Sequence, residues 1–126
     1  MKFLGKITGA AVVAAALTVA AHAQSPVGSW TRPSTGTVIQ FYDCSGKLCA
    51  RITGVKDQSK KDTVGKVIMS GAEKSGDNQW KGSLLNTDDG QTYSGVVTLE
   101  GPNALNLKGC VLGGIICKGE TWSRNR

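Results

Sequence analysis

Residues 37–55 read TVIQFYDCSGKLCARITGV, two stretches rich in β-branched and aromatic residues on either side of a short turn. Such stretches favour strands, and we predict one strand over 37–44 and its antiparallel partner over 49–55. From residue 28 onward the chain continues as short apolar segments between turns rich in glycine, aspartate and asparagine. Further strands are expected near residue 30 and over 66–69, 80–85, 92–100, 104–110 and 115–124. The polar stretches 55–65 and 72–79 fall outside these strands, and no helix is predicted.

About eight short strands joined by turns are typical of a sandwich or a barrel. Closure into a barrel removes the exposed sheet edges that a small exported domain would otherwise have to protect. The residues therefore predict an all-β fold and leave sandwich and barrel open, with closure favouring a small antiparallel up-and-down β-barrel.

The N-terminus has the pattern of a cleaved export signal. Lys2 and Lys6 precede an uncharged apolar run over 7–21, and Ala21-His22-Ala23 supplies the small residues that a signal peptidase recognises. The run is shorter than the roughly 20 residues needed to span a bilayer. We predict a secretory signal peptide over residues 1–23 and a single mature domain over 24–126, with no membrane span after cleavage.

All four cysteines lie in the mature part, and an even number in an exported chain predicts two disulfides. Of the three possible connectivities, the local pairs Cys44–Cys49 and Cys110–Cys117 are favoured because each pair brackets a turn. The C-x4-C and C-x6-C spacings do not match zinc knuckles.

The two turns predict different pairings. With Gly46-Lys47 at the centre of a type II′ turn, the first two cysteines face each other in a non-hydrogen-bonded pair, the closer antiparallel pairing. With Gly113-Gly114 at the centre of the second turn, the other two cysteines face each other in a hydrogen-bonded pair. That pairing is about 1 Å wider and fits a disulfide less well, so an irregular turn is expected there.

Charge and composition exclude several functions. Loss of Lys2 and Lys6 lowers the formal net charge from +6 to +4, and the scattered basic residues favour loose contact with anionic surfaces but are no nucleic-acid footprint. The only histidine, His22, lies in the predicted signal peptide. The mature chain therefore lacks the commonest general base, metal ligand and nucleophile activator. We predict no catalytic residue, metal or cofactor.

Asp88 and Asp89 are the remaining candidates for acid–base chemistry or calcium binding. In a turn, aspartate side chains usually accept hydrogen bonds from backbone amides. A calcium loop needs more oxygen ligands and a bidentate glutamate, and no glutamate lies nearby. Asp89 and Gly90 are therefore interpreted as structural turn residues.

Three segments, in this order, resemble the DUF2147 family of small exported bacterial proteins. They are VGSW at 27–30, DDGQTYSG at 88–95, and LKGCVLGG at 107–114 followed by TWSR at 121–124. The cysteine hairpin also fits the proteobacterial members, and the resemblance covers nearly all of 27–124. Family members often carry a proline before the D-G-x-x-Y turn, where this chain has Leu85-Asn86-Thr87, so a local change of turn is expected.

The resemblance implies a lipocalin-like barrel and a periplasmic location, and it implies no reaction. In lipocalin-like barrels the tryptophan of the G-x-W motif packs at the closed end beneath a basic residue of the last strand, a contact worth about 0.5–2 kcal/mol. Trp30 and Arg124 would play these parts, with Gly28 and Trp122 as further structural residues. The alternative is that Arg124 is a solvated charge near the terminus.

Two functions stay open. The first is a non-catalytic binding module for a small apolar or amphipathic ligand, with Tyr93, Trp80 and Tyr42 as candidate ligand-binding residues. Phe41 and Tyr42 are neighbours on one strand, so one should face inward and the other outward. The second is a protein-interaction or envelope-stress module, for example inhibitor-like, that meets an envelope protein through the basic loop 56–66 or the turns at one end. A barrel this small can be filled by its own side chains, and a cavity wide enough for an acyl chain would favour the first function. The sequence predicts no oligomeric state.

Overall fold

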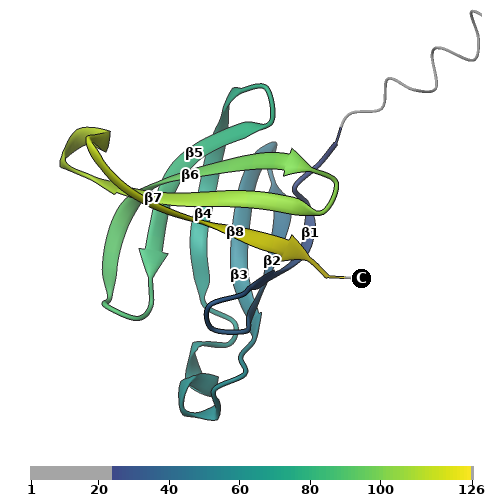
Figure 1. Ribbon diagram of the computed structural model, residues 1–126, viewed down its shortest axis with the longest axis vertical. Coiled ribbons are helices and arrows are strands. Elements are labelled where there is room, and N and C mark those ends of the chain that lie inside the picture. The colour runs from purple at the N-terminus through teal and green to yellow at the C-terminus, as the bar shows by residue number, and fades with distance from the viewer. Residues whose placement is uncertain (1–23, 126) are drawn as a thin grey trace, which may run out of the picture.

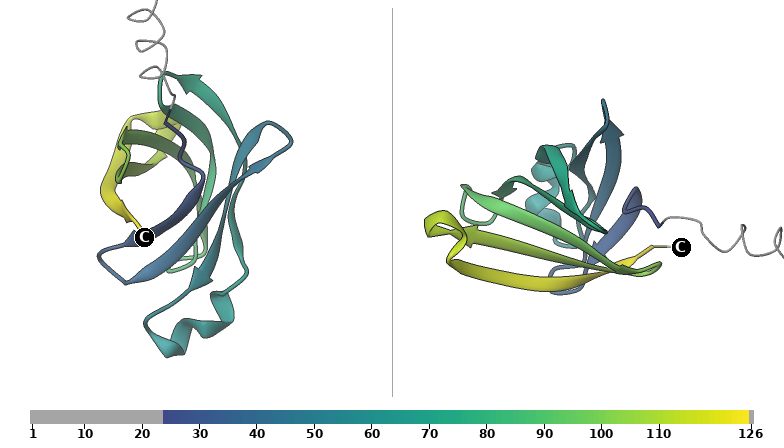
Figure 2. Two further views of the ribbon diagram at one scale, coloured as in Figure 1. Left: turned by 90° about the vertical axis from the view of Figure 1, so that its right-hand side faces the viewer. Right: turned by 90° about the horizontal axis from the view of Figure 1, so that it is seen from above.

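Each strand pairs with its neighbours in the sequence, and the last strand pairs with the first, which closes an antiparallel barrel (Figure 1). The computed structural model describes residues 24–125. Figure 2 shows the strands surrounding a common interior. The strands are β1 (Gly28–Arg32), β2 (Thr37–Cys44), β3 (Lys47–Gly54), β4 (Val67–Gly76), β5 (Gln79–Asn86), β6 (Gln91–Gly101), β7 (Ala104–Val111) and β8 (Ile116–Arg124). The predicted all-β, up-and-down barrel is confirmed.

Two segments differ from the sequence prediction. Strand β4 continues through the polar stretch to Gly76, because Glu73 and Lys74 pair with Lys81 and Trp80 of β5 in a hairpin. The loop between β3 and β4 contains a 3-10 helix, η1 (Gln58–Thr63), where Asp57 accepts a hydrogen bond from the Ser59 amide. Both segments lack an apolar pattern, so their structure depends on cross-strand pairing and on capping.

The predicted signal peptide over 1–23, with His22, lies outside the described residues. Among residues 24–125, no helix is both long enough and apolar enough to cross a membrane.

The core follows the two-residue alternation of the strands. Phe41 is 1% exposed while its neighbour Tyr42 lies on the outer face, as the alternation predicts. The Phe41 and Trp122 rings pack with their centroids 6.2 Å apart. Gly82 allows β4 and β5 to approach closely, since a Cβ there would lie 2.7 Å from Ala72 Cα.

One end of the barrel is closed by the N-terminal segment. Trp30 is completely buried and donates a hydrogen bond through its indole N–H to the Pro26 carbonyl, at 2.8 Å. The Arg124 guanidinium carbon lies 4.4 Å from the Trp30 ring centroid. Position 28, beside this contact, requires glycine. The φ of Gly28 is +136°, and a Cβ on this residue would lie 2.7 Å from Arg124 Nη1. Arg124 therefore stacks on the tryptophan, and the alternative of a solvated terminal charge is wrong.

The two predicted disulfides, Cys44–Cys49 and Cys110–Cys117, are both present. The predicted turn between the first two cysteines is wrong by one residue. Ser45 and Gly46 both have positive φ (59° and 84°), which is typical of a type I′ turn.

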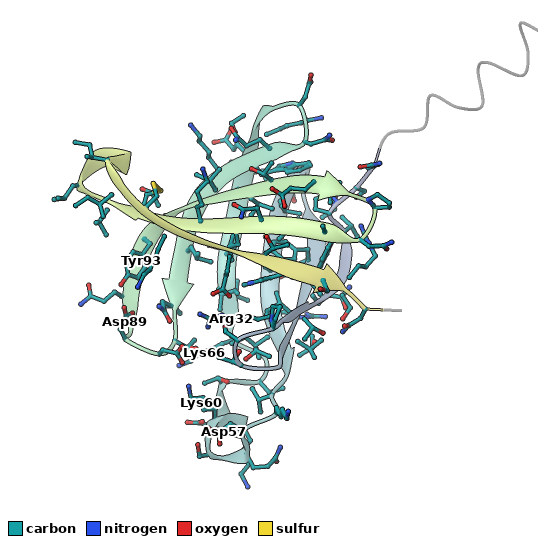
Figure 3. All side chains as sticks on the ribbon, in the orientation of Figure 1. Arg32, Asp57, Lys60, Lys66, Asp89 and Tyr93 are labelled. Carbon is teal, nitrogen blue, oxygen red and sulfur yellow. A yellow bond between two sulfur atoms is a disulfide. The ribbon has the colours of Figure 1, made fainter. Side chains whose placement is uncertain are left out.

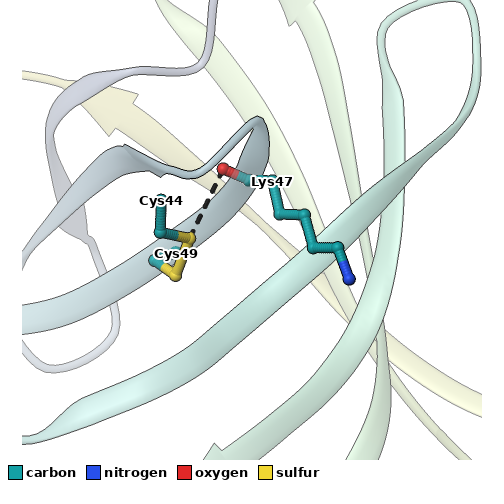
Figure 4. The surroundings of a disulfide bond; sticks show 3 residues. All are labelled: Cys44, Lys47 and Cys49. Carbon is teal, nitrogen blue, oxygen red and sulfur yellow. Dashed lines mark hydrogen bonds between the residues drawn. A yellow bond between two sulfur atoms is a disulfide. The ribbon is translucent and has the colours of Figure 1, made fainter.

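That shift changes the pairing of the first hairpin. Cys44 pairs with Lys47 and Cys49 pairs with Tyr42, so the disulfide links diagonal positions whose Cα atoms are 5.9 Å apart. Figure 4 shows this hairpin, in which Cys44 Sγ lies 3.4 Å from the Lys47 carbonyl oxygen.

In the second hairpin the cysteines pair directly, as predicted, but their Cα atoms are only 4.1 Å apart instead of at the wider spacing. The connecting segment is the irregular turn that was expected. It contains the 3-10 turn η2 (Leu112–Gly114), and Leu112, Gly113 and Gly114 all have positive φ.

Candidate functional site

The half of the barrel away from Trp30 is not filled by side chains. It holds a cavity of about 510 Å³ that opens between the loops at that end. The inner part of the cavity is apolar and is lined by Ile39, Ile52, Ile68, Leu84, Leu107 and Trp122. Polar and charged side chains line the outer part, namely Arg32, Lys60, Asp88, Tyr93, Lys118 and Glu120. We call these two sets the floor and the rim.

The sequence of the terminal strands explains why the lining changes from apolar to charged. Inward positions recur every second residue, so the β1 face continues from Trp30 to Arg32. On β8 the same face holds Trp122, Glu120 and Lys118. On both strands the first step from the tryptophan toward the open end therefore replaces a buried aromatic ring with a charged side chain.

An ion-pair network crosses the rim. Arg32 donates a hydrogen bond through Nε to Glu120, and its Nη1 lies 3.4 Å from Asp88 Oδ2. Lys60 Nζ lies 2.7 Å from the other oxygen of Asp88. The network joins β1, β8, the turn between β5 and β6, and η1. Figure 3 shows Arg32 and Lys60 at this end of the barrel.

The carboxyl groups of the rim are held in their ionised forms. Burial opposes ionisation of Glu120, but hydrogen bonds from Arg32 and from the Trp122 indole (2.8 Å) keep its pKa below the ordinary value. The hydrogen bond from Lys60 lowers the pKa of Asp88, with a further contribution from the charge of Arg32. These groups serve as fixed charges near neutral pH.

The three candidate ligand-binding residues do not come together. Tyr93 lines the cavity, and its hydroxyl donates a hydrogen bond to Asp89. That bond raises the pKa of Tyr93, and Figure 3 shows the two residues side by side. Trp80, which was predicted to bind the ligand, does not line the cavity. It packs against the core near the start of β5, with Lys74 Nζ 5.7 Å from its ring centroid.

Tyr42, the third predicted ligand-binding residue, does not line the cavity either. It lies on the outer face of β2, with the Arg51 guanidinium carbon 5.1 Å from its ring centroid. Its neighbour Phe41 takes the inward position, so Tyr42 cannot line the interior.

Asp89 and Gly90 have the structural roles expected of them. The Asp89 carboxylate accepts the Gln91 amide at 2.8 Å, and Gly90 adopts a positive φ of 72°. The Tyr93 hydrogen bond and the Gln91 amide both lower the pKa of Asp89.

Sequence reasoning missed the network that Asp88 forms. Asp88 bonds to Lys60, 28 positions away, and to Arg32, 56 positions away, and Arg32 reaches Glu120 at a separation of 88 positions. No local motif marks such pairs. The one available signal was the two-residue alternation, which places Arg32 and Glu120 on the inward faces of β1 and β8.

The arrangement suits binding by shape, apolar contact and fixed charge. Within residues 24–125, no group of three His, Cys, Asp or Glu side chains is placed to hold a metal ion. The cavity combines an apolar interior with a polar opening, which is the usual construction of a small-molecule site.

Comparisons with known proteins agree with this class of fold. The model of a family described as an uncharacterized protein conserved in bacteria (DUF2147) matches residues 28–124. The chain belongs to the DUF2147 family. No curated protein matches it.

Among solved structures, the chain is similar to protein HP1028 from Helicobacter pylori, which is described as belonging to the lipocalin family. The two share 22% identity with a TM-score of 0.69, over 82% of this chain and 85% of that chain. At this identity the likeness shows the fold, which is therefore lipocalin-like. The two disulfides indicate an oxidising compartment outside the cytoplasm.

Proposed function

We propose that this protein is a non-catalytic binding module that holds a small amphipathic molecule in the open half of its barrel. The observation that carries the proposal is the cavity of about 510 Å³ with its apolar floor and charged rim. Small-molecule pockets typically measure about 300–1,000 Å³ and place a few polar groups around apolar walls. A packed barrel, as the interaction-module hypothesis required, would have left no such space.

The distribution of polarity defines the ligand class. An acyl or other apolar chain would contact Ile39, Ile68 and Leu107 in the floor. Its polar end would lie among Arg32, Lys60 and Glu120, where it can exchange hydrogen bonds with groups that already form ion pairs. A fully apolar ligand would cover these charges without replacing their hydrogen bonds, which is costly.

A binding role without chemistry agrees with the state of the side chains. The rim carboxylates accept hydrogen bonds from arginine, lysine or tryptophan, and all four cysteines are in disulfides. None of these groups is left in the form of a nucleophile or of a general base with a pKa near neutrality. The predicted export signal and the disulfides together favour the periplasm as the site of action.

Gly109 offers a way to test the cavity directly. It lines the cavity on β7, and a Cβ there would meet Tyr93 Cβ at 3.5 Å, an ordinary contact distance. The change Gly109→Leu therefore places a branched side chain inside the cavity with little strain. Gly54→Leu is the matched control, since its Cβ would meet Val38 at 3.6 Å and Gly54 does not line the cavity.

The experiment is titration of the mature, disulfide-bonded protein with a dansyl-labelled fatty acid, followed by dansyl emission and by quenching of the tryptophan emission, to which Trp122 in the floor contributes. Wild type and Gly54→Leu should bind saturably at one site, and Gly109→Leu should bind at least about ten-fold more weakly, the equivalent of 1.4 kcal/mol. Equal binding by all three proteins, or no saturable binding by wild type, would reject the proposal.

A further inference from the structure

The connection between β7 and β8 exposes large apolar side chains to solvent. Leu112 is 68% exposed, Ile115 82%, Ile116 56% and Val111 40%. We call residues 111–116 the β7–β8 tip. Figure 1 shows it extending beyond the neighbouring strands at one side of the barrel. Adjoining apolar side chains at such exposures mark an interaction site in a soluble domain.

The fold does not require these side chains. Leu112 adopts a positive φ of 54°, a conformation that asparagine or glycine accommodates far better than leucine. The Cys110–Cys117 disulfide and the Val111–Ile116 strand pair hold the base of the tip. The tip is thus a closed loop that presents apolar groups outward instead of packing them.

The tip continues the inner face of the barrel. Toward the tip, the inward positions on β7 are Leu107, Gly109 and Val111. On β8, which runs in the opposite direction, they are Lys118 and then Ile116. Gly109 and Lys118 line the cavity and are strand partners, as are Val111 and Ile116 one step further out. An apolar surface therefore extends from the rim of the cavity to the tip.

The charge around the tip is positive. Between Glu100 and Glu120 the sequence contains two basic residues, Lys108 and Lys118, and no carboxylate. Lys108 and Lys81 lie on the outer face beside Gly113 of the tip. Exposed aliphatic side chains surrounded by lysines are complementary to the surface of an anionic lipid bilayer, because apolar groups enter the acyl boundary while ammonium groups meet the headgroups.

We propose that the β7–β8 tip docks this protein on anionic lipid membranes, with Leu112 and Ile115 inserted into the acyl boundary. Docking is a property of the tip and does not depend on a ligand in the cavity. Docking would also place the mouth of the cavity close to the membrane.

The test uses the mature, unreduced protein with no added ligand and measures co-sedimentation with two kinds of vesicle. One is phosphatidylethanolamine containing phosphatidylglycerol, and the other is pure phosphatidylcholine. The double variant Leu112→Asn with Ile115→Ser should lower the partition coefficient on the anionic vesicles by at least about ten-fold. Lys108→Gln should lower it about five-fold on anionic vesicles and leave it unchanged on neutral ones.

One control variant and the separation of the two assays distinguish this proposal from its alternatives. Val64→Ser with Val67→Ser removes side chains of similar character, 46% and 45% exposed, from the β3–β4 loop and from the first residue of β4, and should leave docking unchanged. The vesicle assay contains no ligand, and the fatty-acid titration contains no vesicle, so a failure of ligand binding and a failure of docking can be told apart.

Absence of anionic-vesicle binding by the wild-type protein would overturn the proposal. Equal partitioning of wild type and the tip variant would do the same. So would sedimentation velocity showing a wild-type dimer that the tip variant dissociates, because the tip would then be a contact between two copies of the chain.

Discussion

Arg124 should be the most important charged residue for stability, although it lies near the end of the chain. Its guanidinium stacks on Trp30 at 4.4 Å and donates hydrogen bonds to the carbonyls of Pro102, Val27 and Ser25 at 2.6, 3.0 and 2.7 Å. It thereby ties the N-terminal segment and the β6–β7 turn to β8. We predict that Arg124→Met opens this end of the barrel.

The expected cost follows from these contacts. A cation–π contact with a buried ring is worth about 1 kcal/mol or more, and each net hydrogen bond about 0.5–1.5 kcal/mol, taken at the low end here because the site is partly exposed. The sum is about 3 kcal/mol. For a domain of this size that corresponds to a fall in Tm of roughly 10–20 °C. Arg124→Lys should fall between wild type and Arg124→Met, since lysine keeps the charge but not the planar set of donors.

The assay is urea unfolding of the mature, unreduced proteins followed by far-UV circular dichroism. Arg51→Met is the matched control, because Arg51 stacks on Tyr42 at 5.1 Å on the outer face and should cost at most about 1 kcal/mol. A loss of less than about 1 kcal/mol for Arg124→Met, or equal losses for the two variants, would refute the structural role given to Arg124.

Three further changes test the fold and the rim. Glu120→Gln removes a carboxylate whose pKa lies below its ordinary 4.5. Wild type should therefore have a higher Tm than the variant above about pH 4.5, and this difference should vanish as the pH falls through the lowered pKa. A difference in Tm that persists in strong acid would contradict this prediction. Gly82→Ala puts a Cβ 2.7 Å from Ala72 Cα and should destabilise the protein by about 1–3 kcal/mol in urea unfolding; a neutral effect would show that β4 and β5 are not packed this closely. Cys44→Ser with Cys49→Ser should lower the free energy of unfolding by about 2 kcal/mol in the same assay, because the disulfide closes only a short loop. Loss of all folded structure would contradict this prediction.

Much of the fold could be predicted from the sequence because its signals are local. The hairpin around Cys44 and Cys49 and the glycine-rich turns mark strand ends directly. Alternation predicts that Phe41 and Tyr42 face opposite sides of the sheet, but it does not say which of them faces inward. The exact turn was missed because Ser45 occupies a positive-φ position that glycine was expected to take. Polar strands such as the second half of β4 carry no apolar pattern, so only their partner strand defines them.

The candidate site was harder to predict because its parts are distant in the sequence. Tyr93 was found through the turn that precedes it, but the pairing of Arg32 with Glu120 and of Asp88 with Lys60 depends on which loops meet at the open end. Whether the barrel is filled or hollow depends on the summed volume of inward side chains in three dimensions. No motif in the chain reports that volume.

The most direct test of the proposed binding function is native mass spectrometry of the unreduced protein purified from its own compartment, compared with Gly109→Leu prepared in the same way. Wild type should carry an additional non-covalent mass of a few hundred daltons that organic solvent releases as an amphipathic molecule, and the variant should not. If both proteins show only the mass of their own polypeptide with two disulfides, or if both carry the same additional mass, the result would contradict the account.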